Sequence, residues 1–254
     1  MAADAAAGPE SFGAASSPAM SSRIGKLRWF GTLVPVVYVW SLPWLATVGF
    51  AHQCRNWPRC AGTGASVSDF ISNTHATGAM AACFFFPAMH LWLNAQHVRE
   101  RRCVQPTLFF FQVCFGAFLC LPVTEAPEPH GVAVCSFCVA ALVHYGVVLR
   151  HCAGERFRLC MAMLCVAICS FATIFILVLI SEADPNLLPE HCPLLFYIME
   201  SAGLSSMAIF PMLWYRERRE VAQQLSDAST SMRDLEAALA VTRAAQPAEL
   251  YSPA

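Results

Sequence analysis

Residues 194–210 read LLFYIMESAGLSSMAIF, an apolar run that carries a single carboxylate, Glu200. The chain of 254 residues is 57% hydrophobic and only 13% charged, which lies outside the usual composition of soluble domains. A lone carboxylate in hydrocarbon is unfavourable, so Glu200 is expected to face the interior of a helix bundle. The run therefore predicts an all-α, polytopic membrane protein.

The number of membrane crossings follows from the lengths of the apolar runs. A bilayer core about 30 Å thick requires about 20 apolar residues per helix. Runs of this kind predict a bundle of six transmembrane helices, at about 29–51, 70–96, 106–123, 130–149, 159–181 and 193–215. Only the insert TEAPEP, residues 124–129, separates the third helix from the fourth. Its two acids and two prolines predict a tight turn at the membrane surface.

The basic residues fall almost entirely on one side of this topology. Fourteen of the sixteen Lys and Arg residues lie in the N-terminal segment, the loops 97–105 and 150–158, or the tail after residue 215. Only Arg55 and Arg59 lie on the opposite side. The positive-inside rule then places both termini in the cytosol.

Three domains are expected. Residues 1–22, rich in Ala, Ser, Gly and Pro, predict a disordered cytosolic N-terminus; residues 23–215 form the six-helix transmembrane domain, and residues 216–254 form a cytosolic tail. A short amphipathic helix is predicted in the tail from apolar residues at steps of three and four: Leu225, Ala228, Met232, Leu235 and Leu239. About two heptads are too few to assign a coiled coil, so this helix is interpreted as lying on the membrane or on a partner protein, with self-association as the alternative.

The loops opposite the cytosol contain cysteines. A lumenal or extracellular side permits disulfides. Cys54 and Cys60 flank the five residues RNWPR and are compatible either with a disulfide that closes this loop or with two free thiols. No CxxC pair with a matching histidine or second pair is present. No metal site and no cofactor are therefore expected.

A set of polar residues recurs near the lumenal ends of the predicted helices. We interpret it as an intramembrane polar cluster, composed of Glu200, His130, His75, Ser72 and Asn73. The competing interpretation is that the histidines simply lie at the interface and that Glu200 makes a structural hydrogen bond. The sequence has no Gly-rich phosphate loop, GxSxG or HExxH motif, so no catalytic residue is assigned and the protein is not expected to be an enzyme.

Several segments together resemble a known family. They are FISNT at 70–74, RERR at 99–102, GAFLCLPVTEAPEPHGVAV at 116–134, and a last apolar run containing Glu200 that is followed by RERRE at 216–220. This order resembles the damage-regulated autophagy modulators and their FRAG and SFK relatives, which include a factor involved in remodelling GPI-anchor lipids. The resemblance covers roughly 27–220 and implies a shared structural role for Glu200 and His130. Asn73 stands where the family motif has an acid.

Two classes of function follow from the resemblance and the residues. The first is a non-enzymatic regulator in the lysosomal, Golgi, ER or plasma membrane that acts through membrane lipids or through protein partners of the tail, with no nucleic acid involved. The second is a lipid-handling, GPI-lipid-remodelling-associated or transport protein that uses the Glu and His residues. Prolines within the predicted spans, which would allow broken helices, are compatible with the second class: Pro35, Pro43, Pro87 and Pro211.

Overall fold

The computed structural model describes residues 18–60, 62–96, 103–152 and 156–244, and within them the only regular elements are eight helices. The helices are α1 (Pro18–Thr47), α2 (Val67–Phe70), α3 (Thr74–Gln96), α4 (Val104–Cys120), α5 (Pro127–Leu149), α6 (Arg156–Ala183), α7 (Leu187–His191) and α8 (Leu195–Ala244).

Five helices contain stretches long and apolar enough to cross a membrane. These are Trp29–Thr47, Thr74–Ala95, Pro127–Leu149, Phe157–Ala183 and Leu195–Trp214. Helix α4, with 17 residues, is a shorter apolar helix. The prediction of an all-helical, multi-pass membrane protein is therefore confirmed.

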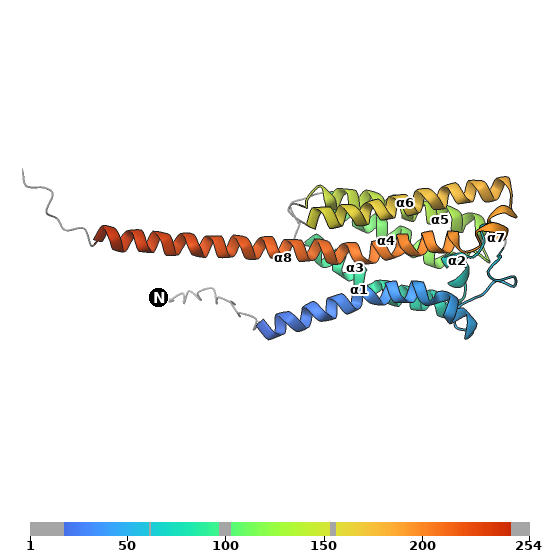
Figure 1. Cartoon of the computed structure of the whole chain (residues 1–254), viewed down its shortest axis with the longest axis horizontal. Helices are drawn as coiled ribbons and strands as arrows, with labels where there is room; N and C mark the ends of the chain where they lie inside the picture. The colour runs from blue at the N-terminus through green and yellow to red at the C-terminus, as the bar shows by residue number, and fades with distance from the viewer. Residues whose placement is uncertain (1–17, 61, 97–102, 153–155, 245–254) are drawn as a thin grey trace, which may run out of the picture.

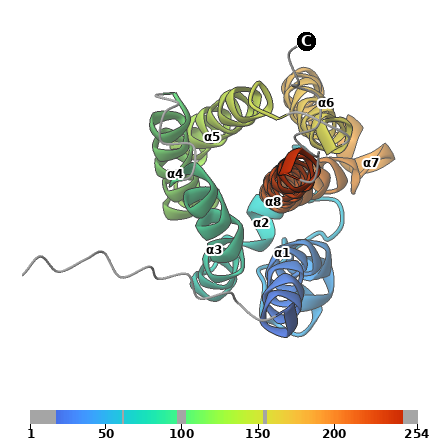
Figure 2. The same ribbon diagram turned by 90° about the vertical axis from the view of Figure 1, so that its left-hand side faces the viewer.

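The long helices run side by side and form a ring when viewed from one end (Figures 1 and 2). Each helix contacts its neighbours in the order α1, α3, α4, α5, α6, α8 and back to α1, and α8 also contacts α3. The one-turn helix α2 lies between α1 and α8, at the end of the bundle away from the projecting part of α8.

The inside and the outside of the ring differ in what their side chains contact. Tyr145, Phe210 and Trp214 are buried among the helices, whereas large apolar side chains on the outside are well exposed. The exposed set includes Phe30, Val37, Trp44, Phe109 and Phe175. A soluble monomer rarely exposes so much apolar surface, and hydrocarbon is the medium that accommodates it.

The second predicted span differs from the structure at its start. The expected helix from residue 70 is interrupted, because α2 ends at Phe70 and α3 begins at Thr74. Asn73 causes the new start, since its Oδ1 accepts a hydrogen bond from the Ala76 N–H at 2.8 Å. The chain therefore turns at Ile71–Asn73 before it crosses the membrane.

The last predicted span continues much further than expected. Helix α8 runs without a break for 50 residues, so the amphipathic segment of the tail is not a separate short helix. Figure 1 shows its C-terminal part leaving the bundle along the direction of the span. No proline or glycine lies between Pro211 and Ala244 to end the helix.

The four prolines do not break their helices, because each lies inside α1, α3 or α8. A proline within a helix leaves the carbonyl four residues earlier without its usual N–H donor. For Pro43 that carbonyl belongs to Val39, and the hydroxyl of Tyr197 donates to it at 2.8 Å. The carbonyls freed in this way inside an apolar bundle need such a replacement donor.

Pro211 in α8 has the same arrangement. The carbonyl freed by this proline is that of Met207, and it accepts a hydrogen bond from the hydroxyl of Tyr145 on α5 at 2.8 Å. The Tyr145 ring also stacks on Phe210, with ring centroids 4.2 Å apart. The two tyrosines therefore join α1 to α8 and α5 to α8 through carbonyls that proline has exposed.

We expect Tyr197→Phe to lower the free energy of unfolding by about 1 kcal/mol, because the Val39 carbonyl loses its donor. Equilibrium unfolding in detergent measures this loss. In a Pro43→Ala background the alanine N–H can bond the Val39 carbonyl, so Tyr197→Phe should then cost almost nothing. An equal loss in both backgrounds would show that the tyrosine hydroxyl does not compensate for the proline.

Candidate functional site

The candidate site is built around helix α2. The hydroxyl of Ser66 accepts the Asp69 N–H at 3.0 Å, and the Asp69 carboxylate accepts the Ser66 N–H at 3.2 Å and the Ser66 hydroxyl at 2.8 Å. This reciprocal arrangement is a capping box, which provides partners for backbone groups that a helix start leaves unbonded. It explains how a helix of four residues is maintained.

Glu200 binds the same helix start from α8. Its Oε2 accepts the Val67 N–H at 2.5 Å, and its Oε1 lies 3.4 Å from the Ser68 hydroxyl that donates to it. The Glu200 residue is only 9% exposed. Because the first N–H groups of a helix lack internal partners and carry partial positive charge, a carboxylate is favoured there. Glu200 therefore holds α2 against α8.

The loop that precedes α2 is bound to the loop that precedes α8. The Ala65 N–H donates to the Pro193 carbonyl at 3.0 Å. Gly64 has a φ of +80°, and a Cβ at this position would lie 2.6 Å from the same carbonyl oxygen. Only glycine combines this backbone conformation with so close an approach.

Aromatic packing holds the other end of α2. The Phe70 ring is buried between Trp57 and Tyr197, with ring centroids 5.0 and 5.5 Å away. Trp57 lies in the loop that Cys54 and Cys60 flank, and the structure joins these two cysteines, whose Cα atoms are 5.7 Å apart. The bridge considered from the sequence therefore closes the loop that packs against α2.

Asp69 lies among charged and titratable neighbours. Burial raises the pKa of its carboxyl above the usual range, and the Ser66 hydrogen bonds and the nearby His52 and His130 lower it again only in part. Glu200 is a second carboxylate within electrostatic range of Asp69. The N-terminal turn of α2 thus has two acids close together, and the N–H groups at the helix start partly offset their charge.

His130 contacts the turn between α4 and α5. Its Nδ1 lies 2.5 Å from the Leu121 carbonyl, so Nδ1 donates and Nε2 carries the lone pair of the neutral ring. The ring packs against Phe118, and Nε2 has no hydrogen-bond partner among the described residues. His130 lies near Asp69 but forms no hydrogen bond to Asp69 or Glu200 in the structure.

The remaining residues of the predicted cluster have separate roles. The Ser72 hydroxyl donates to the Asp69 carbonyl at 2.8 Å, and Asn73 donates to the Phe50 carbonyl at 3.1 Å while it caps α3. His75 is exposed, so the structure does not bring it to Glu200. Because α3 begins at Thr74, its buried position at this level is Ala76, and the adjacent His75 faces outward.

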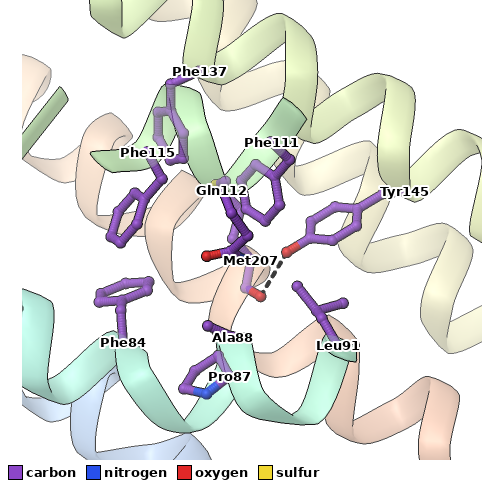
Figure 3. Close-up of a pocket in the computed structure, with 10 residues that line it drawn as sticks. All are labelled: Phe84, Pro87, Ala88, Leu91, Phe111, Gln112, Phe115, Phe137, Tyr145 and Met207. Carbon is purple, nitrogen blue, oxygen red and sulfur yellow. Dashed lines mark hydrogen bonds between the residues drawn. The ribbon is translucent and has the colours of Figure 1, made fainter. Parts of the chain in front are cut away.

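Two small pockets lie inside the ring. One is lined by Glu200 together with apolar side chains such as Phe137, Cys138 and Leu204, and its volume is about 20 Å³. The other, also about 20 Å³, is lined by residues of α3, α4, α5 and α8, and the Tyr145–Met207 hydrogen bond lies beside it (Figure 3). Such volumes hold about one water molecule and are too small for a lipid headgroup.

Sequence reasoning missed the backbone partners of Glu200. The relevant pattern is SVSD at 66–69, which fits the capping-box signature of Ser followed three residues later by an acid. That signature could have located the start of α2. It could not have shown that Glu200, 133 residues away in the chain, would bind the same helix start.

The fold and this site define a multi-pass helical membrane protein in which the buried carboxylate of Glu200 on α8 caps a short helix at the end of the bundle. Comparisons with protein-family models, with curated proteins and with solved structures found no match to this chain. Within the described part of the chain, no group of three or more His, Cys, Asp or Glu side chains is arranged to hold a metal ion.

Substitutions at Glu200 test its capping role. Glu200→Gln keeps an acceptor oxygen for the Val67 N–H, so we expect only a small loss of stability. Glu200→Leu leaves that N–H buried without a partner, which costs about 1–3 kcal/mol. Thermal unfolding in detergent should rank the proteins wild type, Gln, Leu. Glu190→Leu, at an exposed carboxylate, is the matched control and should unfold like the wild type. A Leu variant as stable as the wild type would exclude the capping role.

Proposed function

We propose that the protein crosses the membrane six times and has both termini in the cytosol. Helix α4 is the crossing that we add to the five long apolar helices, and two contacts support it. Thr107, near the start of α4, lies 3.0 Å from His144 near the end of α5, and Leu121, just after α4, contacts His130 near the start of α5. Helix α4 therefore runs antiparallel to α5 through nearly the same depth, even though it has only 17 residues.

The orientation rests on the distribution of basic residues. Basic residues lie in the part of α1 that precedes its membrane-spanning stretch, directly after the membrane-spanning part of α8, and in the loops 97–105 and 150–158. The α2 region, with the Cys54–Cys60 loop, is at the opposite end. We place this end in the lumen or outside the cell, where a disulfide persists.

For activity, we propose a non-enzymatic regulator in an endomembrane that acts through protein partners of its cytosolic tail. One observation carries this proposal: the Glu200 carboxylate is bound to the start of α2, so it is not free to serve as a catalytic or substrate-binding group. The pocket beside it is almost entirely apolar and too small for a headgroup. The resemblance to autophagy modulators supports an endomembrane location, in lysosome, Golgi or ER.

Helix α8 provides a physical route for such regulation. It carries Glu200 at one end of the bundle and the projecting tail at the other, and at 1.5 Å per residue its 50 residues span about 75 Å. A change at the lumenal contact of Glu200 with α2 can thus shift the tail as a rigid element. A role in lipid handling is the alternative, because Glu200 lines a pocket between α5, α6 and α8.

The topology predicts which engineered cysteines a membrane-impermeant thiol reagent reaches in intact, correctly oriented vesicles. From the lumenal or external side, a cysteine introduced beside Asn186 should react above the background of the native cysteines, and one beside Ser226 should not. The opposite pattern would reverse the orientation. Reaction at both sites, or at neither, would contradict six spans.

The regulatory proposal predicts a requirement for the tail. In cells, the full chain should change autophagic turnover of long-lived proteins, whereas a chain truncated after Glu220, which keeps the basic flank, should reach the same membrane without that effect. Equal effects of the two chains would contradict tail-mediated regulation. If Glu200→Gln instead alters the lipid composition of GPI-anchored proteins while the truncation does not, the lipid-handling alternative is favoured.

A further inference from the structure

The projecting part of α8 exposes a continuous apolar stripe. Met232 is 67% exposed, Leu235 63% and Leu239 50%, and no other described residue covers them. Figure 1 shows this part of the helix clear of the other long helices. Large apolar side chains of this kind in water mark a surface that normally binds a partner.

The spacing of the stripe identifies the kind of partner. Apolar positions recur at alternating steps of four and three residues: Val221, Leu225, Ala228, Met232, Leu235 and Leu239. This average repeat of 3.5 residues places the six residues in a narrow line along one side of the helix, as in a coiled coil, and we call this line the seam. A helix that lies on a membrane has a broader apolar face and lies in the plane of the interface, whereas this one continues the direction of a span.

We propose that the stripe pairs with the same stripe of a second copy of this chain, so that two α8 helices form a parallel coiled coil outside the membrane. All copies in one bilayer have the same orientation, so their tails project on the same side and at the same height. Parallel pairing in register is therefore imposed by the membrane. It does not depend on which side the tail occupies or on the regulatory activity proposed above.

The residues beside the seam create no charge repulsion against a second copy. With Met232 and Leu239 at heptad position a and Leu235 at d, a parallel pair brings Ser231 of one helix next to Glu236 of the other, and Gln224 next to Ser229. No like charges meet in these pairs. The charged residues Asp227, Arg233 and Asp234 fall on the outer side of the pair, where they remain in water and available to other proteins.

The seam is short, so pairing of two copies depends on their being held in the same membrane. The repeat extends over about three heptads with alanine at one core position, which is short for a coiled coil of free peptides. Anchoring both helices in one membrane raises their effective concentration, as a linker does for two tethered binding modules. The bundle thus makes a weak seam sufficient for pairing.

The test uses the full chain in membranes, with two differently tagged copies expressed together. The photoreactive residue p-benzoylphenylalanine replaces either Leu235 in the seam or Arg233 on the outer side. We expect irradiation to give a product with both tags from position 235, at least fivefold more abundant than from position 233. No two-tag product, equal yields from both positions, or a product with a different protein would each overturn the proposal.

A second comparison separates pairing through the seam from pairing through the bundle. With the photoreactive residue at Leu239, the double substitution Met232→Glu and Leu235→Glu should reduce the two-tag product at least fivefold. The matched substitution Arg233→Glu should leave it unchanged. Met232 and Leu235 are exposed and lie outside the bundle, so each variant should keep the parent's thermal unfolding temperature in detergent, which shows that the bundle is intact. A product that survives the double substitution would contradict seam pairing.

Discussion

The bilayer interior offers no hydrogen-bond partners, so every backbone polar group at membrane depth must find one inside the protein. Helices meet this requirement except at their ends and at prolines. In this chain the carbonyls freed by Pro43 and Pro211 accept from Tyr197 and Tyr145, and the opening N–H of α2 is taken by Glu200. Tyr145, Tyr197 and Glu200 are therefore explained by backbone groups that need partners.

Helix α8 takes part in each of these contacts. It supplies Tyr197 to α1 and Glu200 to α2, and it presents the Met207 carbonyl to Tyr145 of α5. The same helix continues outward as the projecting tail. A helix held at several points along its membrane portion moves as one body, so the end of the bundle that holds α2 is mechanically connected to the tail.

The apolar runs were sufficient to predict the all-helical, multi-pass architecture, because length and hydropathy decide whether a helix can cross a bilayer. Contacts between residues far apart in the chain could not be predicted from length and hydropathy. His75 lies exposed rather than beside Glu200, in the first turn of a helix that Asn73 caps. The role of Glu200 depends on Val67, and that of Tyr197 on Val39, and pairs so far apart in the chain are brought together only by the fold.

The pairing of proline with tyrosine also bears on how such a sequence can change over evolutionary time. Pro211 is tolerated because the Tyr145 hydroxyl donates to the Met207 carbonyl that the proline leaves without a donor. The Tyr145 hydroxyl is tolerated in an apolar interior because the same carbonyl accepts its hydrogen bond. Loss of either residue alone leaves a polar group without a partner. Relatives of this protein should therefore keep both residues or lose both, and the two positions should covary although one lies in α5 and the other in α8.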